Sequence, residues 1–326
     1  MPGAGGSEPA RFVVDESSFD FRGLTEDRLT DAMDEFSDTL DGLRGTYTVS
    51  VSPWWFDAEC ADGRDLHDVL YEGGTPKAGR DARLRMATLM DRCPPWDPDL
   101  PGLPDEVTMK GEESHLALSV GYAWWHAGNQ RHVGCLVFPV PGRRGWHLVS
   151  AAGPKTAGPT ERELYFLAGA HELPEFWRSL FVRENVREHD FIVRAREAFP
   201  GLDFAESLTF RKFDGGYGQM RDWVIHVLTV VNDHFSEALA MHSGMAANIQ
   251  AELGRHGLTL SPESTNTRSK ARIMRQRDVP HEGEVYRCEW HAKQEPNRNR
   301  VHFSLPDPRL GGRILIGIFV DHLDTE

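Results

Sequence analysis

Apolar residues recur three and four positions apart in two long segments, which is the period of an amphipathic helix. Thr25 precedes the first pattern and Gly45 follows it, and these residue types begin and end helices well. The second pattern is the clearest in the chain. The first stripe consists of Leu29, Met33, Phe36, Leu40 and Leu43, and the second of Met220, Trp223, Val224, Val227, Leu228, Val231, Phe235 and Leu239.

Weaker patterns predict shorter elements elsewhere. Helices are expected at 66–71, 82–90, 160–170, 174–181, 187–199 and 245–253, and strands at 12–14, 46–51 and 207–213. The segment 116–125 fits either a helix or a strand. Two apolar runs, at 132–140 and 145–150, flank the turn sequence PGRRG, and this pattern predicts a β-hairpin.

Three further strands are predicted near the C-terminus, at 284–293, 300–305 and 313–321. The segments between them are short and rich in turn residues, so an antiparallel meander is expected. The third strand is apolar on both faces, as a covered strand would be. Together with the helices, this sheet predicts the α/β (α+β) class, with mixed helical N-terminal and middle regions and a C-terminal antiparallel β-sheet packed on helices.

The chain of 326 residues suits two domains or one elaborated domain. We expect a disordered tail at 1–10, an N-terminal α/β region at 11–155, and a helical region leading into the C-terminal sheet at 156–326. The first ten residues lack the basic and apolar segments of a signal peptide. No run approaches the roughly 18 apolar residues of a membrane span. A cytoplasmic protein without a membrane partner is therefore expected.

The first two C-terminal strands each have one apolar and one ionisable face, because residues two apart share a face. Glu289, His291 and Lys293 point one way on the first strand. Arg300 and His302 share a face on the second. If these faces align, an imidazole able to move a proton lies beside cations that can stabilise phosphate charge. The five residues are the candidate catalytic site, although the wet face of any half-exposed sheet carries similar side chains.

Charge is distributed unevenly along the chain. The net charge is −14, yet the segment 268–313 holds eleven basic and six acidic residues, so it carries +5 and the remainder −19. A basic segment in an acidic protein favours RNA or another polyanion as a partner. Arg275, Arg277, Arg287 and Arg298 are the candidate nucleic-acid contacts. Arginines on a solvated face would give the same count.

Other motifs do not indicate a cofactor or a metal. The four cysteines form no CxxC pair, and this pattern favours reduced, buried thiols over a zinc site. The glycine-rich segment 214–218 matches neither GKS/GKT nor GxGxxG, so it predicts a tight turn. The chain has no HExxH helix and no Gly-x-Ser-x-Gly elbow. We therefore expect no cofactor and no metal ion.

The run YRCEWHAK…NRVHFSL…RILIGIFVDHL resembles the closing strands of small ribonuclease toxins of the RelE and HigB type. The portion at about 216–326 is similar to them in placing helices before an antiparallel sheet with a basic face. The resemblance implies mRNA cleavage, often on the ribosome, and an antitoxin-like inhibitory partner. It also implies that Lys293 and Arg300 are the strand-borne cations and His302 a candidate acid or base.

Three functional hypotheses follow. The first is a metal-independent, toxin-like ribonuclease, an endoribonuclease that uses the basic sheet face. The acidic N-terminal region would then restrain it or dock a partner. The second is a non-catalytic nucleic-acid- or protein-binding subunit of a larger system, such as a defence system, in which the same face makes phosphate contacts alone. The third is an enzyme acting on a small molecule in a pocket away from the sheet.

Overall fold

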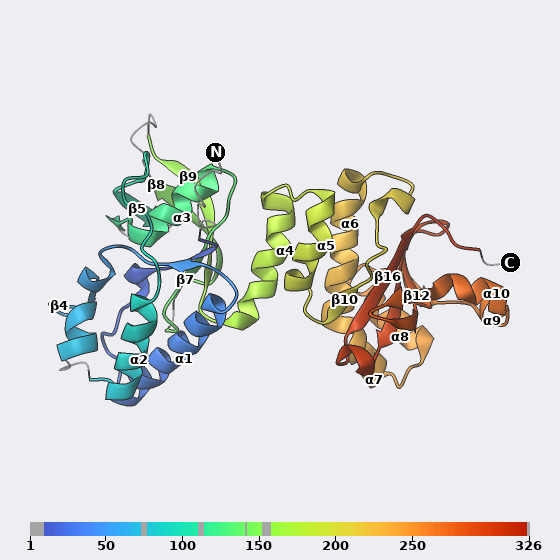
Figure 1. The fold of residues 1–326 in the computed structure, drawn as a ribbon, viewed down its shortest axis with the longest axis horizontal. Coiled ribbons are helices and arrows are strands. Elements are labelled where there is room, and N and C mark those ends of the chain that lie inside the picture. The colour runs from blue at the N-terminus through green and yellow to red at the C-terminus, as the bar shows by residue number, and fades with distance from the viewer. Residues whose placement is uncertain (1–9, 73–76, 110–113, 141, 152–157, 325–326) are drawn as a thin grey trace. The chain divides into compact units, whose positions relative to one another are not determined.

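The structure is a computed structural model that describes residues 10–72, 77–109, 114–140, 142–151 and 158–324 (Figure 1). Contacts divide the chain into two compact units, Met1–Phe176 and Trp177–Glu326. The α/β class is confirmed. The division falls later than the predicted boundary at 155/156, so the segment 158–176 belongs to the first unit. Except for Ala10, the predicted tail at 1–10 lies outside the described residues.

The N-terminal unit is built on a seven-stranded mixed sheet with the strand order β2-β1-β7-β9-β8-β5-β6. The neighbours from β2 to β9 are parallel, and the neighbours from β9 to β6 are antiparallel. These strands are β1 (Phe12–Val14), β2 (Val49–Ser50), β5 (Glu106–Met109), β6 (His115–Leu116), β7 (Gly134–Leu136), β8 (Gly145–Ala151) and β9 (Thr160–Leu167). A separate hairpin pairs β3 (Glu59–Ala61) with β4 (Arg64–Asp65).

Helices pack against this sheet and its strand ends. They are α1 (Glu26–Arg44), α2 (Arg80–Asp91) and α3 (Leu118–Gly128). The predicted first helix is confirmed, because Thr25 Oγ1 accepts a hydrogen bond from the Arg28 amide and α1 ends before Gly45. α3 buries Val120 and Trp124 in one core with strand residues such as Cys135. The ambiguous segment 116–125 is thus largely helical.

Two predictions for this unit are wrong. β9 lies between β7 and β8, so the segments 132–140 and 145–150 do not form a hairpin. The segment 160–170, predicted to be a helix, contains β9. Its charged run Glu161–Glu163 is typical of a helix. Strand pairing on both sides overrides this local preference, because each neighbour supplies the backbone partners of an extended chain.

The C-terminal unit contains a five-stranded sheet with the order β10-β16-β15-β14-β11. Its strands are β10 (Leu202–Phe204), β11 (Leu260–Pro262), β14 (Trp290–Glu295), β15 (Arg298–Pro306) and β16 (Ile314–Val320). The predicted meander is confirmed for β14, β15 and β16, which pair antiparallel in sequence order. The predicted strand at 284–293 is split, because β13 (Glu284–Arg287) leaves the sheet and pairs with β12 (Asp278–His281).

The α-helices of this part of the chain lie between Leu173 and Met274, so the first begins just before the division between the units. They are α4 (Leu173–Arg183), α5 (Glu188–Ala198), α6 (Tyr217–Val230), α7 (Ser236–Met241), α8 (Ala246–Gly254), α9 (Thr265–Arg268) and α10 (Ala271–Met274). The long predicted stripe is confirmed, with a π-helical turn at Val231–Phe235 joining α6 to α7. Phe235 lies in that turn, and its ring centroid is 5.2 Å from that of Trp290 and 5.0 Å from that of Phe303.

The strand predicted at 207–213 is wrong, because this segment contains the 3-10 turn Phe210–Lys212. Strand β10, a few residues earlier, was not predicted. Phe210 and Phe213 instead pack their rings against Phe319 of β16. Aromatic burial at the end of the sheet therefore explains the apolar residues of this segment without an extended strand. No helix among the described residues is both long enough and apolar enough to cross a bilayer.

The β12–β13 hairpin covers the other face of the sheet at Gly317 of β16. A methyl group at Gly317 would lie within contact distance of Cys288 Sγ and 2.8 Å from Val279 Cγ2. Gly317→Ala should therefore destabilise the protein by about 1–3 kcal/mol through overpacking, as measured by urea unfolding.

Gly218→Ala is the matched control for this substitution. Gly218 lies in the first turn of α6, and no atom lies within 4 Å of the position that its Cβ would take. This variant should be neutral, or more stable by up to about 1 kcal/mol. Equal destabilisation of both variants would contradict the close approach of the hairpin to β16.

Candidate functional site

The ionisable residues predicted on one face of the C-terminal sheet do meet there. His291 of β14 lies opposite His302 of β15, and Lys293 lies opposite Arg300. The two imidazole ring centroids are 4.8 Å apart. The prediction that these two strands align their ionisable faces is confirmed, and four of the five candidate catalytic residues lie side by side.

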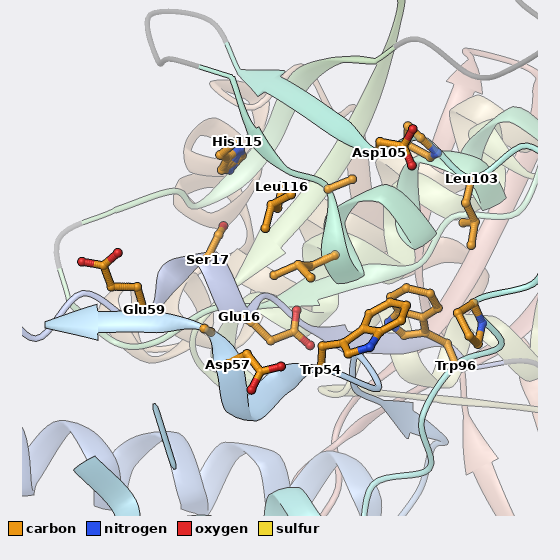
Figure 2. Close-up of a pocket in the computed structure, with 15 residues that line it drawn as sticks. Glu16, Ser17, Trp54, Asp57, Glu59, Trp96, Leu103, Asp105, His115 and Leu116 are labelled. Carbon is orange, nitrogen blue, oxygen red and sulfur yellow. The ribbon is translucent and has the colours of Figure 1, made fainter. Parts of the chain in front are cut away.

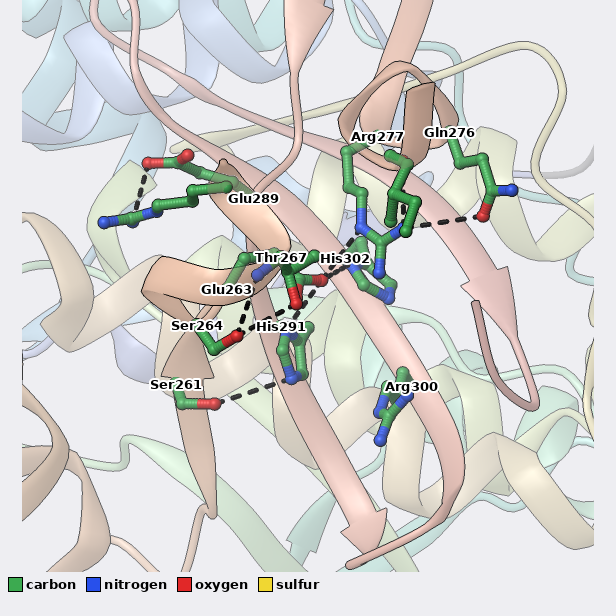
Figure 3. Close-up of polar contacts among 12 residues, drawn as sticks. Ser261, Glu263, Ser264, Thr267, Gln276, Arg277, Glu289, His291, Arg300 and His302 are labelled. Atoms are coloured by element: carbon green, nitrogen blue, oxygen red, sulfur yellow. Dashed lines mark hydrogen bonds and ion pairs between the residues drawn. The ribbon is translucent and has the colours of Figure 1, made fainter. Parts of the chain in front are cut away.

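This face is buried, contrary to the wet surface that the sequence suggests. His302 is 0% and His291 5% exposed. The 3-10 turn Arg275–Arg277 follows α10 and places Arg277, also 0% exposed, beside the imidazoles (Figure 3). Arg277 therefore lies inside the unit and does not present its guanidinium to a nucleic acid.

Glu263 links these buried groups, and it follows directly after β11. Its Oε1 accepts a hydrogen bond of 2.9 Å from Arg277 Nε. The same oxygen is 3.6 Å from His291 Nδ1 and 4.0 Å from His302 Nδ1. Figure 3 shows Glu263 at the centre of this group. A buried guanidinium requires such a partner, because an unpaired buried charge is costly.

Burial and nearby cations keep both imidazoles uncharged at neutral pH. Burial is the main cause that lowers the pKa of His291 to about 2, and the neighbouring groups His302 and Lys293 lower it further. Burial and the charge of Arg277 lower the pKa of His302 to about 3. A neutral imidazole can accept a proton, but it cannot act as the general acid that phosphodiester cleavage also needs.

A small pocket of about 340 Å³ opens beside this group. It is lined by Ser261, Pro262, Glu263, Ser264, Asn266, Thr267, His291, Lys293 and Arg300. Arg300 Nε is buried without a hydrogen-bond partner, and the described residues offer neither Lys293 nor Arg300 an ion pair within 4.0 Å. Burial lowers the pKa of both side chains. Like charges directly opposite on neighbouring strands destabilise a sheet, so this pocket favours an anion.

The other predicted residues lie away from the pocket. Glu289, the fifth candidate, is half-buried and accepts a hydrogen bond of 2.9 Å from Arg268. Arg287 is exposed and forms an ion pair with Asp278. Arg298 is exposed and pairs with Asp214 and Glu295, whereas Arg275 is simply exposed. The surface cations of the basic segment are thus partly neutralised by neighbouring carboxylates.

Glu263, His291 and His302 also have the donor set of a zinc site, with ligand atoms within 4.8 Å of one another. Glu263 already accepts from Arg277 at the shared oxygen, and Lys293 lies on the same face. A dication would add to several buried positive charges, so electrostatics favour an anion at this place. Two other groups with suitable donors are Asp65, His67 and Asp68, and Asp203, His281 and Glu282.

Sequence reasoning missed Ser261 and Glu263 of this site. Their segment, Leu260–Glu263, is too short to show the alternation of a strand. The available signal is the hydroxyl-rich sequence SPESTNT, which begins at Ser261 and is typical of capped turns. Ser264 does cap α9 there, because its Oγ accepts a hydrogen bond from the Thr267 amide.

A second feature that sequence reasoning missed is the buried carboxyl group of Glu16 in the N-terminal unit. Glu16 Oε1 accepts hydrogen bonds from the Ser52 amide at 2.7 Å and from Ser119 Oγ at 2.8 Å. Burial raises the pKa of Glu16 to about 7, although these hydrogen bonds oppose the shift. Perturbed carboxyl groups of this kind occur at functional sites and also in structural networks. The available signal was an Asp-Glu pair directly after an apolar strand.

The fold and these side chains define an α/β protein with a small pocket on its C-terminal sheet that is lined by Lys293 and Arg300. Comparison of the chain with protein-family models, with curated proteins and with solved structures gave no match. The geometry of the sites therefore carries the functional argument.

Arg277→Leu should destabilise the protein by about 3–5 kcal/mol, because it leaves Glu263 buried without its guanidinium partner. The double variant Glu263→Leu/Arg277→Leu removes both charges and should recover much of this loss. Urea unfolding monitored by circular dichroism measures both. A double variant no more stable than Arg277→Leu would show that the cost comes from lost packing instead of an unpaired charge.

The raised pKa of Glu16 makes stability depend on pH. The folded state holds this proton up to about pH 7, whereas the ordinary pKa of a glutamate, as in the unfolded chain, is 4.5. Stability should therefore fall as pH rises through this window, by up to about 3 kcal/mol. Glu16→Gln should reduce this fall, and the exposed control Glu35→Gln should retain it. Thermal unfolding from pH 4.5 to 7.5 checks the result, and identical pH profiles for all three proteins would contradict it.

Proposed function

We propose that the C-terminal unit is a non-catalytic binding module that holds a phosphate group of single-stranded RNA in the pocket at Lys293 and Arg300. The observation that carries this proposal is the direct opposition of these two cations, which lack a carboxylate partner within ion-pair distance among the described residues. A phosphate between them would neutralise both charges and supply the acceptor that Arg300 Nε lacks.

The size and lining of the pocket support recognition of a single phosphate. Its volume of about 340 Å³ suits one phosphate with part of a sugar, and not a duplex. Ser261, Asn266 and Thr267 add hydroxyl and amide groups beside the cations. Such groups can donate to and accept from a ribose 2′-hydroxyl, which distinguishes RNA from DNA.

Binding is proposed in preference to cleavage because of the state of the two histidines. His302 is fully buried, so a substrate would have no access to it. His291 lines the pocket but is uncharged near neutral pH, so it does not supply a proton to a leaving group. The pocket therefore has cations that can bind a phosphate, but among the described residues it has no general acid that could complete its cleavage.

The test measures binding of a 5′-phosphorylated RNA oligonucleotide by fluorescence anisotropy over a range of salt concentrations. Two phosphate-contacting cations predict a slope of log K against log salt of about −1.4, from about −0.7 per contact on a single strand. Lys293→Met should weaken binding about tenfold or more and bring the slope to about −0.7. Arg298→Ala, which removes an exposed, paired cation, is the control and should change affinity by less than about threefold.

Competition distinguishes the forms of the ligand. DNA of the same sequence should bind more weakly than RNA, and inorganic phosphate should compete with both. A slope steeper than about −3 would indicate contacts along the strand and would overturn the single-phosphate pocket. RNA cleavage in the presence of a metal chelator, lost in His291→Ala, would overturn the non-catalytic assignment and support a ribonuclease.

A further inference from the structure

A cleft with a volume of about 880 Å³ lies in the N-terminal unit (Figure 2). It is larger than the small cationic pocket of the C-terminal unit, and its lining has a different chemical character. Aromatic and aliphatic side chains line much of it, together with carboxyl groups from separate segments of the chain. The charged and aromatic lining residues are Glu16, Trp54, Asp57, Glu59, Trp96, Asp105 and His115.

The cleft lies where a parallel sheet of this topology places its ligands. Glu16 and Ser17 follow the carboxyl end of β1, and Trp54 follows that of β2. β1 lies between β2 and β7 in the sheet and is parallel to both. The chain leaves β1 through α1 to reach β2 on one side, and it returns later to form β7 on the other side, so the strand order reverses at β1. Open α/β sheets bind ligands outside the carboxyl ends of their strands near such a reversal of strand order.

Two tryptophans form an aromatic wall of the cleft. Trp96 is held firmly, because its Nε1 donates a hydrogen bond of 2.8 Å to Ser119 Oγ and its ring stacks on Tyr122. Trp54 meets Trp96 edge-on, with ring centroids 6.1 Å apart, and remains 51% exposed. Figure 2 shows the two indoles beside each other at the cleft. Trp54 therefore packs against a neighbour that is held in place, and part of its ring remains uncovered for contact with a ligand.

Carboxyl groups supply the charge of the cleft. Asp57, Glu59 and Asp105 are exposed, and the described residues place no lysine or arginine within ion-pair distance of them. Among the described residues, those that line the cleft include neither lysine nor arginine. The N-terminal unit as a whole has 29 acidic and 16 basic residues. The electrostatic potential in the cleft is therefore negative and selects against anionic ligands.

We propose that this cleft binds an organic cation, namely a protonated amine carried on an aromatic or aliphatic body. The ammonium group lies against the face of Trp54 and near Asp57, and the apolar body lies among Leu103, Leu116 and the indoles. A cation over a tryptophan face gains electrostatic attraction from the ring, most strongly where water is excluded. Carboxylates without other partners add charge-assisted hydrogen bonds. Each feature of the lining thus matches one part of such a ligand.

The test compares three probes that share a phenyl group on a short alkyl chain and differ in charge: 2-phenylethylamine, 2-phenylethanol and 3-phenylpropionate. Isothermal titration calorimetry on the full chain should give the tightest binding for the amine, at least about tenfold tighter than for the alcohol, and the weakest for the carboxylate. Trp54→Leu keeps an apolar wall but removes the indole, so it should reduce the preference for the amine over the alcohol.

Charge variants separate the carboxylates from the general acidity of the unit. Asp57→Asn should weaken amine binding several-fold and leave alcohol binding unchanged. Asp31→Asn removes the same charge from the exposed face of α1, away from the cleft, and is the matched control, so its amine affinity should equal that of the wild type. Circular dichroism confirms the fold of each variant.

Several results would overturn the proposal. No saturable binding of the amine at millimolar concentration would do so, as would equal affinity for the amine and the carboxylate. Equal losses in Asp57→Asn and Asp31→Asn would show a diffuse charge effect without a site. Lys293→Met, in the other unit, should leave amine binding unchanged, so the outcome is independent of whether the protein binds RNA.

Discussion

The buried ion pair between Arg277 and Glu263 is the interaction on which the C-terminal site depends. A guanidinium with no exposed surface is tolerated only beside a carboxylate. This requirement brings the segment after β11, which carries Glu263, against the strand pair that carries the two histidines. Ser261 lies in β11, which pairs with β14 opposite His291, and Asn266 and Thr267 follow Glu263 in α9. Strand pairing and the ion pair together therefore position the side chains of the pocket.

The same pair also sets the electrostatics of the pocket. Glu263 directs one oxygen to Arg277, so it compensates Lys293 and Arg300 only in part. Burial is the main cause that lowers the pKa of the imidazoles, and the remaining positive charge lowers it further. The cations are left without a close counter-ion. A sheet retains two facing cations at some cost in stability, and a bound phosphate removes this cost. Glu263, His291 and His302 could serve as metal ligands by donor type. The positive charge of the neighbouring side chains nevertheless favours an anion over a metal ion at this place.

The sequence predicted what depends on a regular period. The helix stripe from Leu29 to Leu43 and the shared face of His291 and His302 were both predicted, because their spacing alone determines which side chains meet. Features that depend on tertiary contacts were not predictable. The segment Glu161–Glu163 favours a helix until two neighbouring strands pair with it, and the polar face of β14 suggests solvent until Arg277 covers it. The cleft also escaped prediction, since its lining comes from segments as far apart as Glu16 and His115.

The two sites have opposite electrostatic character, and each is set by the residues that line it. The C-terminal unit is nearly neutral, with 20 basic and 21 acidic residues, so its anion pocket depends on two local cations and not on a basic surface. The N-terminal unit is strongly acidic, and its cleft concentrates that charge around an aromatic wall. Because Coulomb interactions between exposed groups are screened beyond about 10 Å at 0.1 M salt, the lining of each site governs its selectivity. The two proposed sites therefore differ in the sign of the ligand charge that each lining favours.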